Sequence, residues 1–185
     1  ESANYRAAHD IELKINSLHE EGLEHQKAEL KGVEEFAIEC SMIKVGTSED
    51  IQNCADDGIQ IYGGMGFSAD TPMESAWRDA RIGRIYEGTN EINRMLSVGM
   101  LLKKGMKGQI DLMAAVMQSA ANLGSNTPSK ENSGTILVEE QNLIQNFKQL
   151  FLILTGHAVQ KYGTQLEAHQ QVLLGLSDIL IEIYF

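Results

Sequence analysis

The sequence predicts an all-α protein, and three observations support this fold class. The 185-residue chain has only two prolines, Pro72 and Pro128, so long helices are permitted. Apolar residues recur with the spacing of an amphipathic helix along most of the chain. Strict alternation of apolar and polar residues, the pattern of a half-buried strand, occurs nowhere over a useful length. We therefore expect packed antiparallel bundles, with a further helical hairpin towards the C-terminus.

The N-terminal part is predicted to be helical up to about Gly32, although Gly22 and a charged stretch leave the helix boundary open. The next apolar stripe falls at i, i+3, i+4 and i+7 and comprises Val33, Phe36, Ala37 and Cys40. A second stripe follows Thr47-Ser48, whose hydroxyls are suited to cap a helix start. It comprises Ile51, Cys54, Ala55 and Tyr62. We expect that helix to end at Gly63-Gly64, where positive φ carries no Cβ penalty.

The segment Thr71-Pro72-Met73-Glu74 is the strongest local signal. It places Thr at the N-cap, Pro at the first helical position and Glu at N3, which predicts a capping box and a short helix to about Ile82. Another helix is expected to begin near Thr89-Asn90. It should end at the cationic turn Lys103-Lys104-Gly105.

Residues 124–134 are polar and are predicted to form a linker. Two amphipathic helices should follow. The first carries Leu143, Phe147, Leu150, Phe151, Leu154 and Ala158 and stops at Tyr162-Gly163, and the second carries Leu166, Val172, Leu176, Ile179, Leu180 and Ile183. The predicted organisation is a bundle domain over residues 1–123, the linker, and a further helical region over 135–185. The chain starts at Glu1 without a Met and stops inside an apolar pattern, so we expect a piece of a longer protein.

Composition excludes several classes of protein. The formal net charge is −11, and no basic stripe is present, so a nucleic-acid binder is not expected. No apolar run approaches the roughly 18 residues of a membrane span. Two cysteines are too few for a disulfide scaffold, which favours a reducing, intracellular compartment. We expect a cytoplasmic location in a bacterium, which is favoured, or a mitochondrial one if the source is eukaryotic. The five histidines form no metal-binding spacing, and no metal site is predicted.

Two glycine-containing segments are the first candidates for chemistry. Gly63, Gly64 and Gly66 cluster between helices, and Glu87-Gly88-Thr89 precedes a helix start. Such glycines let the backbone approach a ligand, and helix N-termini favour anionic groups. From spacing alone, the preferred explanation is structural: tight connections between packed helices, and an ordinary carboxylate near a helix N-terminus.

Three blocks of sequence then share the spacing of a known family. Gln-Ile-Tyr-Gly-Gly-Met-Gly-Phe occupies residues 60–67, Trp-Arg-Asp-Ala-Arg-Ile residues 77–82, and Ile-Tyr-Glu-Gly-Thr-Asn-Glu-Ile-Asn-Arg residues 85–94. Together they resemble the C-terminal helical domain of acyl-CoA dehydrogenases, whose pattern reads Q-I-x-G-G-x-G-(F/Y), R-D-x-(R/K)-I and (Y/F)-E-G-T-(S/N)-x-I-x-R. The resemblance covers about the last 150 residues. The region after residue 137 is similar to the C-terminal extension of the very-long-chain members. The full protein would then be a larger α/β/α enzyme.

The resemblance implies FAD-dependent α,β-dehydrogenation of a fatty acyl-CoA to 2-enoyl-CoA, as in fatty acid β-oxidation. Glu87 matches the catalytic base, and Tyr86 and Gly88 match substrate contacts. Cofactor contacts are matched by Gln60, Ile61, Tyr62, Gly63 and Gly64, on the flavin of a neighbouring subunit, and by Thr89, Asn90 and Glu91. The resemblance also implies a homodimer and an electron-transfer flavoprotein as acceptor. We expect the isolated piece to be inactive. Arg78, Asp79, Arg81 and Arg94 are expected to form structural ion pairs rather than phosphate contacts.

Two alternatives remain at this stage. An acyl-CoA oxidase resembles the dehydrogenases but passes electrons to oxygen, and a non-catalytic oligomerisation module would need no carboxylate at position 87. A Met-rich face from Met106 to Met117 is reminiscent of the membrane-surface segment of very-long-chain relatives. Its polar face is not rich in Lys and Arg, so packing against the bundle is the preferred interpretation.

Overall fold

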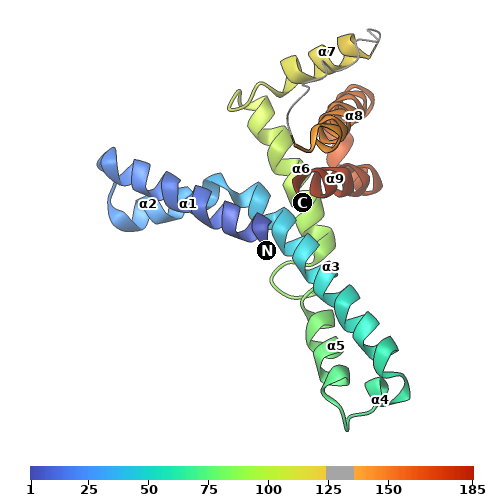
Figure 1. The fold of residues 1–185 in the computed structure, drawn as a ribbon. Coiled ribbons are helices and arrows are strands. Elements are labelled where there is room, and N and C mark those ends of the chain that lie inside the picture. The colour runs from blue at the N-terminus through green and yellow to red at the C-terminus, as the bar shows by residue number, and fades with distance from the viewer. Residues whose placement is uncertain (124–135) are drawn as a thin grey trace. The chain divides into compact units, whose positions relative to one another are not determined.

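The computed structural model describes residues 1–123 and 136–185, and every regular element in these ranges is a helix (Figure 1). The all-α prediction is therefore confirmed. The chain divides into two compact units, Glu1–Ser97 and Val98–Phe185. The predicted linker at 124–134 lies outside the described residues, so the division at 123 and 135 remains a prediction. In the described ranges, no helix combines the length and the apolar content that a membrane span requires.

The first unit begins with a helical hairpin. Helices α1 (Ser2–Glu20) and α2 (His25–Glu35) lie side by side in Figure 1, joined by a turn in which Gly22 has φ 89°. Both helices also pack on α3 (Ala37–Tyr62). The predicted stripe from Val33 to Cys40 spans two helices, because the chain leaves helical geometry at Phe36.

Helix α3 runs for 26 residues without interruption, so the predicted helix start at Thr47-Ser48 is wrong. Both hydroxyls donate to carbonyls of the preceding turn. Thr47 Oγ1 lies 2.7 Å from the Ile43 oxygen, and Ser48 Oγ lies 3.0 Å from the Val45 oxygen. Hydroxyl side chains can bond in this way inside a helix as well as at its start. The predicted end is confirmed, since Gly63 follows the helix with φ 60°.

Beside α3 lie the short helix α4 (Gly64–Phe67) and α5 (Pro72–Ile82) (Figure 1). The bounds of α5 confirm Thr71 as N-cap and Pro72 as first residue, but the capping box does not form. The Thr71 hydroxyl instead donates to the Met65 carbonyl at 2.6 Å, and Glu74 accepts from Arg78 at 3.4 Å. The threonine thus ties α5 to α4 rather than closing its own helix.

Helix α6 (Asn90–Met106) starts where the sequence predicts, and its last turn carries Lys103 and Lys104. The predicted stop at Gly105 is displaced: Gly105 is still helical, and Gly108 has the positive φ, 68°. The chain is not helical again until α7 (Leu112–Asn122). The Met-rich face from Met106 to Met117 is therefore split between two helices.

The second unit is organised around α8 (Val138–Tyr162), which packs against α7, the 3-10 helix η1 (Gly163–Ala168) and α9 (Gln170–Tyr184). Burial of a side chain such as Phe151 contributes about 1.5–3 kcal/mol. Gly156 faces Val116 so closely that a Cβ there would overlap its Cγ1. The end of α8 at Gly163 is as predicted, whereas Leu166 belongs to η1 instead of the following helix. Helix α7 packs on α8, but Met106, Met113 and Met117 are exposed in the described ranges, so the expected packing of the Met-rich face is not confirmed for these side chains.

Candidate active site

The turn between α5 and α6 holds the candidate base. Glu87 has φ 56° and Gly88 has φ 84°, so two consecutive residues adopt left-handed backbone geometry. For a non-glycine residue this costs on the order of 1–3 kcal/mol, and such outliers cluster at functional sites. The Glu87 side chain is exposed within this chain. In the described part of the chain, the Glu87 backbone N–H donates to no protein group. The turn thus presents a carboxylate and an available N–H from one residue.

The carbonyl of Gly88 is held by two side chains from different helices. Lys44 Nζ on α3 donates to it at 2.7 Å, and Asn93 Nδ2 on α6 donates at 2.8 Å. A Cβ at position 88 would lie 2.9 Å from Asn93 Nδ2. Positive φ therefore favours glycine here, and a Cβ would have to displace the Asn93 amide that bonds this carbonyl.

Asn90 connects this turn to α3 and is fully buried. Its Oδ1 accepts from Lys44 Nζ at 2.7 Å, and its Nδ2 donates to Ser48 Oγ at 2.9 Å and to Glu49 Oε1 at 3.0 Å. The buried amide has partners on both its oxygen and its nitrogen, as buried polar groups normally do. Its side chain is committed to the protein, so a cofactor contact through that side chain would require this network to open.

Glu49 is the anionic centre of the same network. Arg94 donates to it through two nitrogens, at 2.7 and 2.8 Å, and Arg84 Nη2 lies 3.6 Å away. The hydrogen bond from Arg94, with those from Asn90 and the nearby arginine charges, holds the pKa of Glu49 below its usual value against the effect of burial. Arg94 thus forms the structural ion pair that the sequence led us to expect.

The first turn of α6 is capped from within the chain. Thr89 Oγ1 accepts the Ile92 N–H at 3.2 Å, and the Asn90 N–H donates to the Arg84 carbonyl at 3.1 Å. The pKa of Glu91 is lowered chiefly by its own backbone N–H, with a contribution from Thr89. Because these donors have protein partners, the α6 N-terminus in this arrangement is not an open anion site.

The segment Gln60–Gly64 lies elsewhere on the same unit. Gln60 follows Lys44 by 16 residues on α3, which corresponds to about 24 Å of helix. The structure therefore does not bring Gln60–Gly64 and Glu87 together. Gly63 and Gly64 have open space where a Cβ would point. Gly66 is different, because a Cβ there would lie 2.6 Å from the Ile59 carbonyl.

Apolar side chains are exposed around the same glycines. Ile61 is 82% exposed and Phe67 is 80% exposed, and Tyr62 and Met65 are also on the surface. The described structure of this chain alone does not cover them. Gly63-Gly64 therefore presents open backbone within an apolar surface, whereas Gly66 serves packing.

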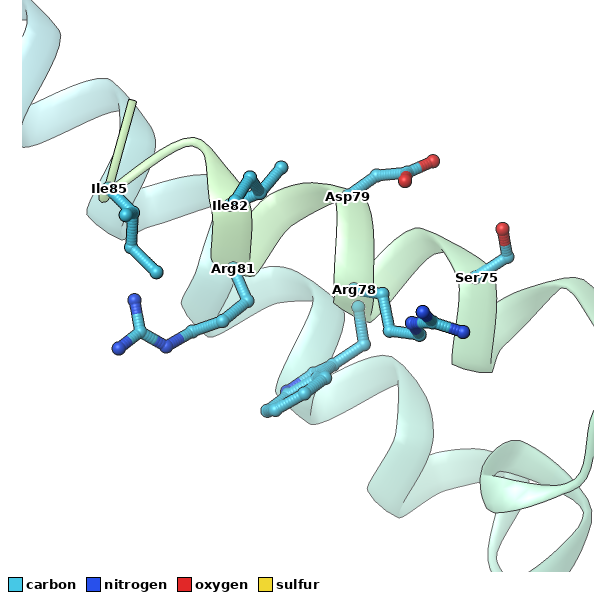
Figure 2. A pocket seen from close by; sticks show the side chains of 7 residues that line it. Ser75, Arg78, Asp79, Arg81, Ile82 and Ile85 are labelled. Atoms are coloured by element: carbon cyan, nitrogen blue, oxygen red, sulfur yellow. The ribbon is translucent and has the colours of Figure 1, made fainter. Parts of the chain in front are cut away.

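A hollow of about 450 Å³ lies along α5 and is drawn in Figure 2. Arg78 and Arg81 extend on one side of α5, and Asp79 points away from them. The hollow is lined by Ser75, Trp77, Arg78, Asp79, Arg81, Ile82 and Ile85. Glu87 is not among these residues, so the hollow is distinct from the candidate base. Arg78 pairs with Glu74 at 3.4 Å, and no ion pair of Asp79 or Arg81 is found in the described ranges.

Lys44, Ser48, Glu49 and Asn93 are site residues that sequence reasoning missed. The first three lie 41 to 46 positions before their partner Asn90, so no local pattern links them to it. One signal was available. Lys44, Ser48 and Glu49 lie three or four positions from the buried residues of α3 and therefore on the same helical face. A face that packs on the core would normally be apolar. The buried residues in question are Ser41, Val45 and Gln52.

Comparison with known proteins gives consistent matches. Residues 7–101 match a family model described as acyl-CoA dehydrogenase, C-terminal domain, and residues 146–185 match a second model of the same description. A probable acyl-CoA dehydrogenase of Bacillus subtilis is 36% identical over 184 residues, covering 100% of this chain and 31% of that protein. The human mitochondrial short-chain specific acyl-CoA dehydrogenase is 46% identical over 68 residues, which are 37% of this chain and 16% of the relative.

Among solved structures, an acyl-CoA dehydrogenase complexed with FAD from Bacillus anthracis superposes with a TM-score of 0.93 at 38% identity. The match covers 100% of this chain and 31% of that one. This chain thus spans about a third of the length of the relatives that it matches from end to end.

Proposed function

Because this chain belongs to the acyl-CoA dehydrogenase family, we propose that it supplies the catalytic base for FAD-dependent α,β-dehydrogenation of a fatty acyl-CoA. The observation that carries the proposal is the Tyr86-Glu87-Gly88-Thr89 turn. Its glutamate is held in left-handed geometry by contacts from α3 and α6. A solvated surface carboxylate has no need of such an arrangement.

The Glu87 carboxylate removes the α-proton of the thioester. An α-proton is weakly acidic, so negative charge that develops on the thioester oxygen must be stabilised by a donor. The Glu87 backbone N–H, which has no protein acceptor in the described ranges, is suited to this role. FAD, when bound, supplies the acceptor of the β-hydride. Tyr86 and Gly88 flank the base and are proposed as substrate contacts.

The surface at Gln60–Gly64 fits a second role in cofactor binding. Open backbone at Gly63 and Gly64 admits close approach by a ligand, and Gln60 offers an exposed amide. Since this segment is about 24 Å along α3 from the contacts that hold the base, we propose that it touches the flavin of a neighbouring subunit. Thr89, Asn90 and Glu91 are proposed to contact the flavin next to their own Glu87 through atoms other than the donors that already have protein partners at the start of α6.

A homodimer follows from this arrangement. The exposed Ile61, Tyr62, Met65 and Phe67 supply the apolar surface that a permanent interface uses. Light scattering of the full-length protein over a dilution series, with flavin content followed in parallel, tests this proposal. A stable monomer with its full complement of FAD would contradict the cross-subunit contact.

The test of the base is Glu87→Gln in the full-length enzyme. The amide keeps the size of the side chain but not its basicity, so FAD and acyl-CoA binding persist while turnover falls by about 10²–10⁴-fold. Glu29→Gln is the control, because it neutralises an exposed carboxylate of α2. Anaerobic bleaching of the flavin by acyl-CoA measures the half-reaction directly. Turnover of Glu87→Gln close to that of wild type would show that the base lies elsewhere.

We further propose fatty acid β-oxidation as the metabolic context and an electron-transfer flavoprotein as the acceptor. The relatives include a bacterial protein and mitochondrial ones. We therefore propose a cytoplasmic location if the source is bacterial and a mitochondrial one if it is eukaryotic. Admitting oxygen after the anaerobic half-reaction tests the acceptor, because a dehydrogenase keeps its flavin reduced under product whereas an oxidase reoxidises it at once.

A further inference from the structure

We propose that Lys44 is a positioning residue that holds the Glu87-Gly88 turn in its reactive geometry. The inference rests on the proposed role of Glu87 as the base and adds a residue on another helix. Lys44 lies on α3, 43 positions before Glu87, and its ammonium bonds the Gly88 carbonyl and the Asn90 amide oxygen, both at 2.7 Å.

The two bonds of Lys44 fall on either side of one short connection. Gly88 is the second left-handed residue of the turn, and Asn90 is the first residue of α6. Lys44 thereby links the turn and the helix start to α3. Asn93 donates to the same Gly88 carbonyl from α6 at 2.8 Å. With one donor from each helix, the Gly88 carbonyl cannot rotate without losing both bonds.

The conformation that Lys44 fixes is one that Glu87 does not prefer by itself. A glutamate with φ 56° relaxes towards negative φ unless its surroundings prevent this. Such a relaxation would displace both the carboxylate and the backbone N–H of residue 87. Displacement of a reacting group by about 1 Å costs up to about 10²-fold in rate.

The electrostatic surroundings suit an ammonium at this position. Burial lowers the pKa of Lys44, and the carboxylates of Glu91, Glu87 and Glu49 oppose that effect. Glu49 is itself neutralised by Arg94 and Arg84. The half-buried lysine thus has three carboxylates in its surroundings, of which Glu49 already has arginine partners.

The experiment compares Lys44→Met with Lys44→Arg in the full-length enzyme. Methionine keeps an unbranched chain but removes the donors and the charge, so kcat falls by about 10–100-fold while KM and flavin content change less than about threefold. Arginine keeps charge and donors and recovers most of the lost kcat. Lys27→Met is the matched control, because that ammonium pairs with Glu24 on the surface of α2.

A second arm separates positioning from a merely structural role. If Lys44 acts through Glu87, Lys44→Met causes no further loss of kcat in a Glu87→Gln background. A structural role lowers kcat by the same factor in both backgrounds, which would overturn the inference. A kcat of Lys44→Met within threefold of wild type would overturn it as well.

Asn93→Ala keeps the inference testable if Lys44→Met does not fold. It removes the other donor to the same carbonyl without a change of charge, and kcat is expected to fall with KM unchanged. An unchanged kcat in Asn93→Ala would count against the inference. A wild-type enzyme that dehydrogenates no acyl-CoA would instead refute the proposed function, whatever Lys44 does.

Discussion

Removal of the Glu49 carboxylate should loosen the contact between α3 and α6 by a predictable amount. In Glu49→Ala, Arg94 loses two hydrogen bonds of 2.7 and 2.8 Å, and Asn90 loses one of 3.0 Å. The side chains of Glu49 and Arg94 are 25% and 18% exposed. In burial, this ion pair is intermediate between two known cases. Exposed ion pairs contribute about 0.2–1 kcal/mol to stability, and disruption of a buried pair costs about 3–5 kcal/mol. We expect a loss of about 2 kcal/mol.

Amide hydrogen exchange measures this loss locally, which suits a large protein with a bound cofactor, because such proteins generally do not follow two-state unfolding. A loss of about 2 kcal/mol corresponds to about a 30-fold fall in protection. The fall should appear at the amides of α6 from Asn93 to Ser97 in the full-length protein. Glu29→Ala removes an exposed carboxylate of α2 and should leave these amides unchanged. Protection within threefold of wild type would refute our estimate for the Glu49 pair.

The stability difference between wild type and Glu49→Ala should depend on pH with a defined sign. The pKa of Glu49 is lower in the folded protein than its ordinary value of 4.5. The stabilisation is therefore fully present above about pH 4.5 and is lost as the pH falls through the lower, folded value. Wild type and Glu49→Ala should differ equally at pH 5 and pH 7 and converge in more acidic solution. A difference that already fades between pH 7 and pH 5 would point to a different titrating group.

Two glycine pairs give further tests by local amide hydrogen exchange in the full-length protein and by flavin content. Gly64→Ala has room for its Cβ, so it should keep the stability of the protein while lowering its flavin content. In Gly66→Ala the Cβ meets backbone atoms, and the local free energy of unfolding should fall by about 1–3 kcal/mol. Equal flavin content in Gly64→Ala and wild type would argue against the proposed contact. In the second unit, Gly156→Ala places a Cβ against Val116 and should lower the local free energy of unfolding by about 1–3 kcal/mol. Gly175→Ala faces open space in a helix and should raise it by about 0.4–1 kcal/mol. The opposite order would contradict the packing of α7 on α8.

Helical periodicity was sufficient to predict the fold class and most helix ends. Gly63 and Gly163 end helices as expected, because positive φ is cheap only for glycine. The local details of polar residues were less predictable. Thr47 has the chemistry of an N-cap but bonds backwards inside α3, and Thr71 stands at an N-cap but bonds α4. A hydroxyl has several acceptors within reach, and only the folded backbone decides between them.

The motif around Glu87 was predictable from the sequence, whereas the residues that hold it were not. Lys44 and Glu49 meet Gly88, Asn90 and Arg94 only because α3 and α6 are packed together. Contacts of that sequence separation leave no periodic trace in one sequence. The position of Gln60–Gly64 is easier to predict. Once α3 is known to be continuous, its length alone separates this segment from Glu87.

The continuity of α3 also sets which changes in the sequence the chain can accept. Insertion or deletion of one residue between Lys44 and Gln60 would turn one end of the helix by about 100° relative to the other and shift it by about 1.5 Å. One end would then lose its register with the turn at Glu87, or the other would lose its register with the surface at Gly63-Gly64. Substitutions on the solvent side of α3 carry no such penalty. The spacing between these two residues is therefore more strictly constrained than the identity of most residues between them.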